Sequence, residues 1–144
     1  MTNKSKKPLE GVRVIEVGQL LAGPFAGCML AYFGAEVIKV EPPETGDPIR
    51  NWRVIEEGTS LWWRSIARNK KSVTIDLRQE EGRSLVKSLM DSADVVIENF
   101  RPGTMEKWGL GPEDIKKQNP KLVYARISGY GQDGPYSRKP GFAS

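Results

Sequence analysis

Short runs of apolar, mostly β-branched residues recur along the chain and predict five β-strands. The runs include VRVIEV, EVIKVE and KSVTIDL, and each ends at a glycine, a proline or a polar turn. Their nearly continuous apolar character is typical of strands that are covered on both faces of a sheet. The predicted strands span residues 12–17, 36–41, 71–77, 95–97 and 122–128.

The segments between these runs carry the pattern of helices. Phe25, Met29, Tyr32 and Phe33 fall at helical spacing, and Gly34 supplies the stop of that helix. The predicted helices span residues 24–33, 60–67, 79–90, 104–108 and 113–118. Strand and helix thus alternate through the chain, which predicts an α/β fold with a doubly wound parallel sheet.

Two segments do not fit this alternation. Residues 42–60 form a long polar connection rich in proline and glycine, and such loops are often functional. Leu61, Trp62 and Trp63, just after it, are expected to be buried. Residues 129–144 are rich in turn-forming residues, and domains seldom end in such a segment. We therefore expect the chain to be part of a longer protein.

Composition excludes several kinds of site. The chain has 144 residues, one cysteine and no histidine. An internal disulfide, a cysteine-rich zinc site and any histidine-based site are therefore excluded. No run approaches the roughly 20 apolar residues of a membrane helix, and the start MTNKSKKPLEG lacks the apolar segment of a secretory signal. We expect a cytoplasmic protein that binds neither a metal nor a membrane.

The formal net charge of +4 comes mainly from the N-terminus. Lys4, Lys6 and Lys7 lie within the first seven residues, and the rest of the chain has 19 basic against 18 acidic side chains. No basic patch interleaved with aromatic residues supports nucleic-acid binding. We expect residues 1–8 to form a flexible basic tail.

The loop after the first predicted strand, residues 18–24, reads GQLLAGP. Its glycines match the first half of a P-loop, but Pro24 stands where the phosphate-binding lysine should be. Ligands of open α/β sheets bind beyond the carboxyl ends of the strands. The loop is either a tight β–α turn or a ligand-contact loop, and the pattern alone leaves both open.

Two further segments allow a structural and a functional interpretation. Residues 68–71 (RNKK) are a solvated basic run or a phosphate contact. Residues 99–103 (NFRPG) follow the fourth strand and form either a plain turn or a nucleotide-binding turn.

No carboxylate is singled out as an acid or a base, and the lone cysteine, Cys28, is expected to be a packed thiol. The acidic residues that suit turns, caps or ion pairs are Asp47, Asp76, Asp94, Glu98 and Asp133.

Five segments in order resemble the family III CoA-transferases of the CaiB/BaiF type, the group that contains formyl-CoA transferase, carnitine CoA-transferase and the α-methylacyl-CoA racemases. The matching segments are LEGVRVIEVGQLLAGPFAG, LAYFGAEVIKVEPPETGDPIRNW, RNKKSVTIDLR, ADVVIENFRPGTMEKWGLG and NPKLVYARISGYGQDGPYSRKPGF. Each is weak alone, and the five together are specific.

The resemblance implies a Rossmann-like large domain, a small domain and two interlocked subunits. Residues 9–144 would form the N-terminal part of the CoA-binding large domain, and the whole protein would be a homodimer. The substrates would be an acyl-CoA and a carboxylate acceptor. Pro42 stands where the family often has a basic residue, and Arg50 lies in the loop that follows.

The resemblance also implies a set of CoA contacts. Gln19, Leu21 and Ala22 would face the thioester, and Ile75, Asp76, Leu77 and Arg78 would lie by the adenine and ribose. Asn99, Phe100 and Arg101 would flank the pantetheine and pyrophosphate. Lys107 is a phosphate candidate, and Arg138 and Lys139 lie near a last contact at about residues 140–143.

The family's transferases use an aspartate that attacks the thioester and forms a mixed anhydride with the acyl group. The resemblance places this nucleophile beyond residue 144, so no catalytic residue is assigned here, although Gln19 is a possible auxiliary group. The racemases instead use a histidine in a Gly-His-Asp segment that aligns with Gly141-Phe142-Ala143. Phenylalanine cannot transfer a proton. A transferase is therefore favoured over a racemase, and a non-catalytic CoA-binding fragment is the third alternative.

Overall fold

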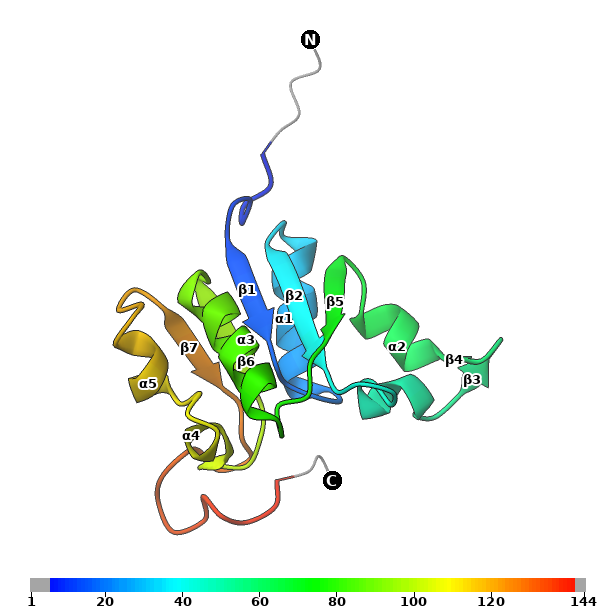
Figure 1. The fold of residues 1–144 in the computed structure, drawn as a ribbon. Coiled ribbons are helices and arrows are strands. Elements are labelled where there is room, and N and C mark those ends of the chain that lie inside the picture. The colour runs from blue at the N-terminus through cyan, green and yellow to red at the C-terminus, as the bar shows by residue number, and fades with distance from the viewer. Residues whose placement is uncertain (1–5, 142–144) are drawn as a thin grey trace.

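The computed structural model describes residues 6–141 and contains one parallel five-stranded sheet (Figure 1). The spatial order is β5-β2-β1-β6-β7, so the first three parallel strands of the chain run outward on one side and the last two on the other. This is the order of a Rossmann-type sheet. The strands are β1 (Arg13–Glu16), β2 (Glu36–Glu41), β5 (Lys70–Thr74), β6 (Val95–Glu98) and β7 (Val123–Arg126).

Helices cover both faces of the sheet, as the doubly wound prediction requires. Successive residues of a strand point to opposite faces. Val14 of β1 therefore packs with Ala31 of α1, whereas Ile15 packs with Val86 and Met90 of α3. The helices that build these two layers are α1 (Ala22–Tyr32) on one face and α3 (Glu80–Asp91), α4 (Thr104–Lys107) and α5 (Pro112–Lys116) on the other.

Helix α1 packs through small residues, and its aromatic residues face outward. Phe25, Tyr32 and Phe33 are 55%, 44% and 55% exposed. Cys28 is buried, as expected for a packed thiol. The packed face of the helix lies directly over the buried carboxylate of Glu16. It needs small residues because a Cβ on Gly27, in the middle of the helix, would collide with that carboxylate.

The connection at residues 42–60 is more ordered than its composition predicts. It holds a short 3-10 helix, η1 (Pro48–Asn51), and a hairpin of β3 (Ile55–Glu56) and β4 (Thr59–Ser60). Glu57 and Gly58, at the hairpin turn, both have positive φ. The hairpin was not predicted, because strands of two residues are too short to show an alternation of apolar and polar residues.

The predicted burial of the residues after this connection is wrong for Leu61 and Trp62, which are 41% and 43% exposed. They belong to α2 (Leu61–Ile66), where Ile66 is the buried residue. Figure 1 shows α2 beside the edge strand β5 rather than over the sheet, and the helix packs mainly against η1, β4 and α1. None of the helices within residues 6–141 has the length and hydropathy needed to cross a bilayer.

Candidate functional site

The strand order reverses between β1 and β6, so the loops that follow these two strands lie side by side at one edge of the sheet. Asn99, the first residue after β6, joins them. Its Oδ1 accepts from the amide of Gln19 at 2.7 Å, and its Nδ2 donates to the carbonyl of Gln19 at 2.8 Å. A Cβ on Gly18 would lie 2.6 Å from the same Oδ1. The loop after β1 therefore needs glycine for this close approach.

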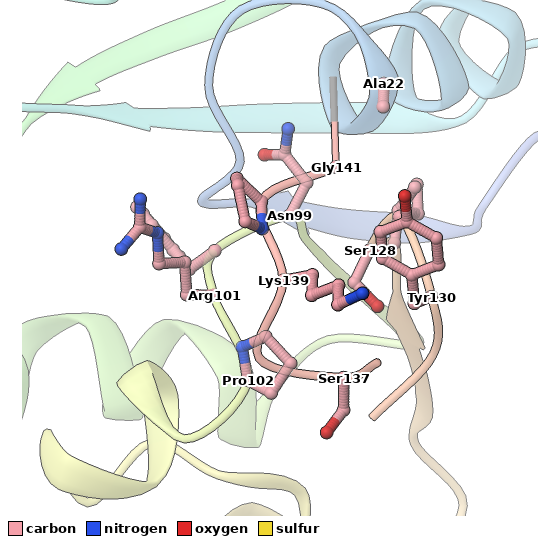
Figure 2. A pocket seen from close by; sticks show the side chains of 13 residues that line it. Ala22, Asn99, Arg101, Pro102, Ser128, Tyr130, Ser137, Lys139 and Gly141 are labelled. Carbon is pink, nitrogen blue, oxygen red and sulfur yellow. The ribbon is translucent and has the colours of Figure 1, made fainter. Parts of the chain in front are cut away.

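A first cavity of about 560 Å³ opens next to this junction (Figure 2). Of the residues expected to contact CoA, Ala22, Asn99, Phe100, Arg101 and Lys139 line it. The sequence did not single out the other polar residues of its wall, Ser128, Tyr130 and Ser137. They come from the turn-rich segment after β7, which has no periodicity from which to place them.

The segment after β7 folds back on itself at the wall of the first cavity. A Cβ built on Gly129 would lie 2.5 Å from the Cα of Gly141, so the two backbones touch. Between them, the Lys139 ammonium lies 3.8 Å from the centre of the Tyr136 ring. The expected contact at residues 140–143 is described only to Gly141, because residues 142–144 lie outside the described part of the chain.

A second cavity of about 400 Å³ lies at the carboxyl ends of β1, β2 and β5. Its wall includes Gln19, Phe100 and the four consecutive residues Ile75, Asp76, Leu77 and Arg78. Pro42 also lines it, at the position where the family often has a basic residue. Phe100 lines both cavities and stacks edge-on against Trp108, with ring centroids 5.3 Å apart.

Three of the residues expected at or near CoA line neither cavity, namely Leu21, Lys107 and Arg138. Leu21 lies at the N-terminus of α1, and Lys107 is exposed at the end of α4. Arg50 also lines neither cavity. Its guanidinium donates two hydrogen bonds, of 2.7 and 2.8 Å, to the carboxylate of Glu41.

Arg78 is the cation of the second cavity, and it is paired with Asp76. Its guanidinium donates to the two carboxylate oxygens of Asp76 at 2.9 and 3.0 Å. These hydrogen bonds lower the pKa of Asp76 to about 2. The pair leaves the Arg78 side chain 80% exposed, so the guanidinium can still meet an anion in the cavity.

Beneath the loops lies a network of buried charges that the sequence analysis missed. Glu16 accepts from Lys39 at 3.1 Å and from Lys70 at 2.7 Å, and all three side chains are at most 2% exposed. Burial raises the pKa of Glu16 and lowers that of Lys70. The sequence signal that could have revealed the network is the position of Glu16 and Lys39. Each lies within an apolar run, VRVIEV or EVIKVE, that predicts a strand covered on both faces.

The basic run at residues 68–71 is solvated at Arg68, Asn69 and Lys71, as one of the two interpretations expects, but not at Lys70. Lys70 is buried against Glu16, and Lys71 is paired with Glu36. The run leads into β5 at its amino end, whereas both cavities lie at the carboxyl ends of the strands.

Three of the five carboxylates singled out in the sequence, in contrast, have the structural roles that their positions suggested. Asp47 caps η1, Glu98 is paired with Arg126, and Asp94 accepts from the amide of Arg13. Within residues 6–141, histidine, cysteine and acidic side chains form no cluster suited to a metal ion.

The buried Glu41 predicts a loss of stability in acid. Burial alone would raise its pKa, but hydrogen bonds from Arg50, Ser72 and the Asp47 amide outweigh burial and lower it to about 2. A depressed carboxylate pKa stabilises the fold above the unfolded pKa, and this stabilisation is lost as the pH falls toward the folded value. The loss between pH 7 and pH 2 should reach roughly 3 kcal/mol for this residue.

Urea denaturation at several pH values measures this loss. The variant Glu41→Gln should be less stable at neutral pH and should show a shallower decline below pH 4.5. If the free energy of unfolding of the variant falls as steeply below pH 4.5 as that of the unmodified protein, other carboxylates cause the loss of stability in acid.

Comparison with known proteins gives the same family along the whole folded part. A family model described as CoA-transferase family III matches residues 9–144. The chain is 58% identical over 144 residues to succinyl-CoA–D-citramalate CoA-transferase of Chloroflexus aurantiacus, covering 99% of this chain and 36% of that protein. It is 47% identical to succinate–glutarate CoA-transferase of Agrobacterium fabrum, covering 95% and 36%.

A solved structure agrees with these relatives. A CaiB/BaiF family protein from Brucella suis superposes with a TM-score of 0.89 at 45% identity, covering 95% of this chain and 37% of that one. The chain thus spans about a third of the length of the curated relatives it matches. Sequence, family model and superposition agree, and the chain belongs to CoA-transferase family III.

Proposed function

We propose that this chain is the N-terminal part of the CoA-binding large domain of an enzyme that moves CoA from an acyl-CoA to a carboxylic acid. The observation that supports this most is the pair of cavities that share Phe100. CoA is a long molecule with a nucleotide at one end and a thioester at the other, and it needs two adjoining sites. All the residues expected at or near CoA except Leu21, Lys107 and Arg138 line at least one of the two cavities.

The two ends of CoA are assigned by the chemistry of the walls. The nucleotide would occupy the second cavity, where Ile75 and Leu77 offer apolar contacts and Arg78 offers a cation. The pantetheine arm would pass Phe100 and bring the thioester to Asn99 and Ala22 in the first cavity. Helix α1 begins there without a side-chain cap, so its first amides are available to an oxyanion.

The proposed reaction proceeds through covalent catalysis by an aspartate outside this chain. The carboxylate attacks the thioester carbonyl, the carbon–sulfur bond breaks, and CoA leaves as a thiolate while a mixed anhydride forms. The thiolate then attacks the aspartyl carbonyl of the anhydride, which frees the acyl group as its acid and leaves an enzyme–CoA thioester. The acceptor carboxylate takes over the CoA in the same two kinds of step. The contribution of this chain is to bind and orient CoA and to offer amide donors to each oxyanion.

The names of the relatives suggest the substrates. Succinyl-CoA is a substrate in the names of several of them, together with citramalate, malate or glutarate. We propose succinyl-CoA as donor and a dicarboxylic acid as acceptor, and a cytoplasmic homodimer as the working form of the whole protein.

The test is CoA exchange by the whole protein, with succinyl-CoA and a panel of mono- and dicarboxylic acids, followed by chromatography of the CoA esters. A new CoA ester that depends on the acceptor is the expected result. Exchange with none of the acids would refute the proposal. Loss of α-deuterium from a 2-methylacyl-CoA would instead support the racemase reaction.

Calorimetry of this chain alone with CoA tests the third alternative. Weak or no binding is expected, because the chain spans only a third of its relatives. Submicromolar affinity would favour an independent CoA-binding module.

A further inference from the structure

The loop after β1 is held through its backbone at three consecutive residues. The Gly18 carbonyl accepts from the Lys39 ammonium at 2.9 Å. Both backbone groups of Gln19 bind the Asn99 amide, and the amide of Leu20 donates to Asp47 Oδ1 at 3.0 Å. The three side chains that hold the loop come from β2, from the loop after β6 and from the start of η1.

One of these residues is held in an unfavourable conformation. Leu20 has a φ of 61°, in the left-handed region that a leucine rarely adopts. A conformation of this kind persists only where the surroundings determine it. The bond to Asp47 provides that constraint, because Asp47 is fully buried and its Oδ1 also accepts from Ile49 at 2.9 Å.

The two buried charges among these groups bind each other. Asp47 Oδ2 lies 2.7 Å from the Lys39 ammonium, and both side chains are at most 2% exposed. A buried ion pair is weak support for stability, because removing two charges from water costs about as much as their attraction returns. Geometry is the better reason for the pair, since Lys39 fixes the position of Asp47 and each of them fixes one end of the same tripeptide.

The side chain of Gln19 remains free in this arrangement. It lines the second cavity and makes no hydrogen bond to the part of the chain that the structure describes. The backbone on both sides of it is bonded, so Gln19 stands on a rigid support and faces space that a ligand can enter.

We propose that Asp47 and Lys39 are positioning residues for the acyl-CoA: they hold the loop after β1 in the one conformation that presents Gln19 to the part of CoA in the second cavity and the start of α1 to the thioester in the first. This inference rests on the proposed CoA-transferase function. Neither side chain touches the substrate in this arrangement, and both act through the backbone of residues 18–20.

Kinetics of Asp47→Asn in the whole protein provide the first test. The variant keeps the size of the side chain but removes the charge that binds Lys39, and either orientation of the new amide sets its Nδ2 donor against the Lys39 ammonium or against the Leu20 amide. We expect kcat to fall at least about tenfold while the KM for the acyl-CoA changes less than about threefold, because the nucleotide contacts at Ile75–Arg78 are untouched. The matched control is Glu36→Gln. It removes an ion-paired carboxylate at the amino end of β2, away from both cavities, and should leave kcat unchanged.

A second variant separates positioning from general stability. Leu20→Gly lowers the cost of the left-handed conformation. If Asp47 acts by holding Leu20, the effect of Asp47→Asn on kcat should be smaller by about threefold or more in the Leu20→Gly background. Equal effects in both backgrounds would overturn the proposal.

Amide hydrogen exchange tests the same claim without any assay of activity. In Asp47→Asn the Leu20 amide should exchange about tenfold faster or more, while the Val17 amide, bonded to Ile97 in the sheet, keeps its protection. Equal acceleration at both amides, or none at Leu20, would refute the positioning role. If the unmodified protein transfers no CoA, the proposed function fails, and the exchange experiment still decides whether the pair holds the loop.

Discussion

Replacing Gly27 with alanine should destabilise the protein by about 3 kcal/mol, although the same change in a free helix would stabilise it by about 1 kcal/mol. The reason is the position of α1 on the sheet. An added Cβ would lie 1.9 Å from Glu16 Oε2. The carboxylate would have to move, and its bonds to Lys70 at 2.7 Å and Lys39 at 3.1 Å would break within a closed interior.

Urea denaturation monitored by circular dichroism measures this effect. The control is Gly58→Ala in the hairpin turn, where an added Cβ meets nothing within 4 Å and only the positive φ of 73° opposes the change. That substitution should cost about 1 kcal/mol. A Gly27→Ala protein that is as stable as the unmodified one would mean that α1 does not lie closely over Glu16.

Replacing Asn99 with aspartate should lower kcat/KM for the acyl-CoA by about 100-fold, if the chain acts as proposed. Aspartate keeps the acceptor for the Gln19 amide but loses the donor. It places a second oxygen 2.8 Å from the Gln19 carbonyl, where Nδ2 now donates. It also adds a negative charge to the wall of a cavity that would receive an anionic ligand.

The matched control for this variant is Asn119→Ala. Asn119 also bridges backbone, donating to the carbonyl of Ala93 at 2.7 Å, but it lines neither cavity. Its removal should lower the free energy of unfolding by about 1 kcal/mol and leave CoA-ester kinetics unchanged. Similar kinetic losses in both variants would trace the Asn99 effect to stability rather than to the loop junction.

The fold could be predicted because its strands are strongly patterned. The run EVIKVE predicted β2 with the bounds that the structure shows, and Pro42-Pro43 marked its end. Alternation of strands and helices gave the fold class, since parallel neighbours require a crossover. The β3–β4 hairpin could not be predicted in this way, because strands of two residues show no period.

The site was predictable only in part, and for a different reason. Asn99 and Gln19 follow strands directly, so the topology rule for parallel sheets brings them together. Lys39 binds the same loop at the Gly18 carbonyl, and Glu16 binds Lys39, yet a charge within an apolar run shows no partner until the strands are paired. Ser128, Tyr130 and Ser137 depend on how a turn-rich segment folds back, which local sequence does not encode.

The strand order has a consequence for the way in which the chain acquires its structure. On one side, strand β1 pairs with β2, which follows it after a short crossover. On its other side, Val14 of β1 pairs with Val95 of β6, which lies much farther along the chain. Contacts between residues so far apart in sequence form late and slow the overall rate. Synthesis proceeds from the N-terminus, so the β1–α1–β2 unit emerges before β6. Until β6 is made, the edge of β1 that will pair with it is unpaired. That open edge makes the nascent chain most prone to mispairing until β6 arrives.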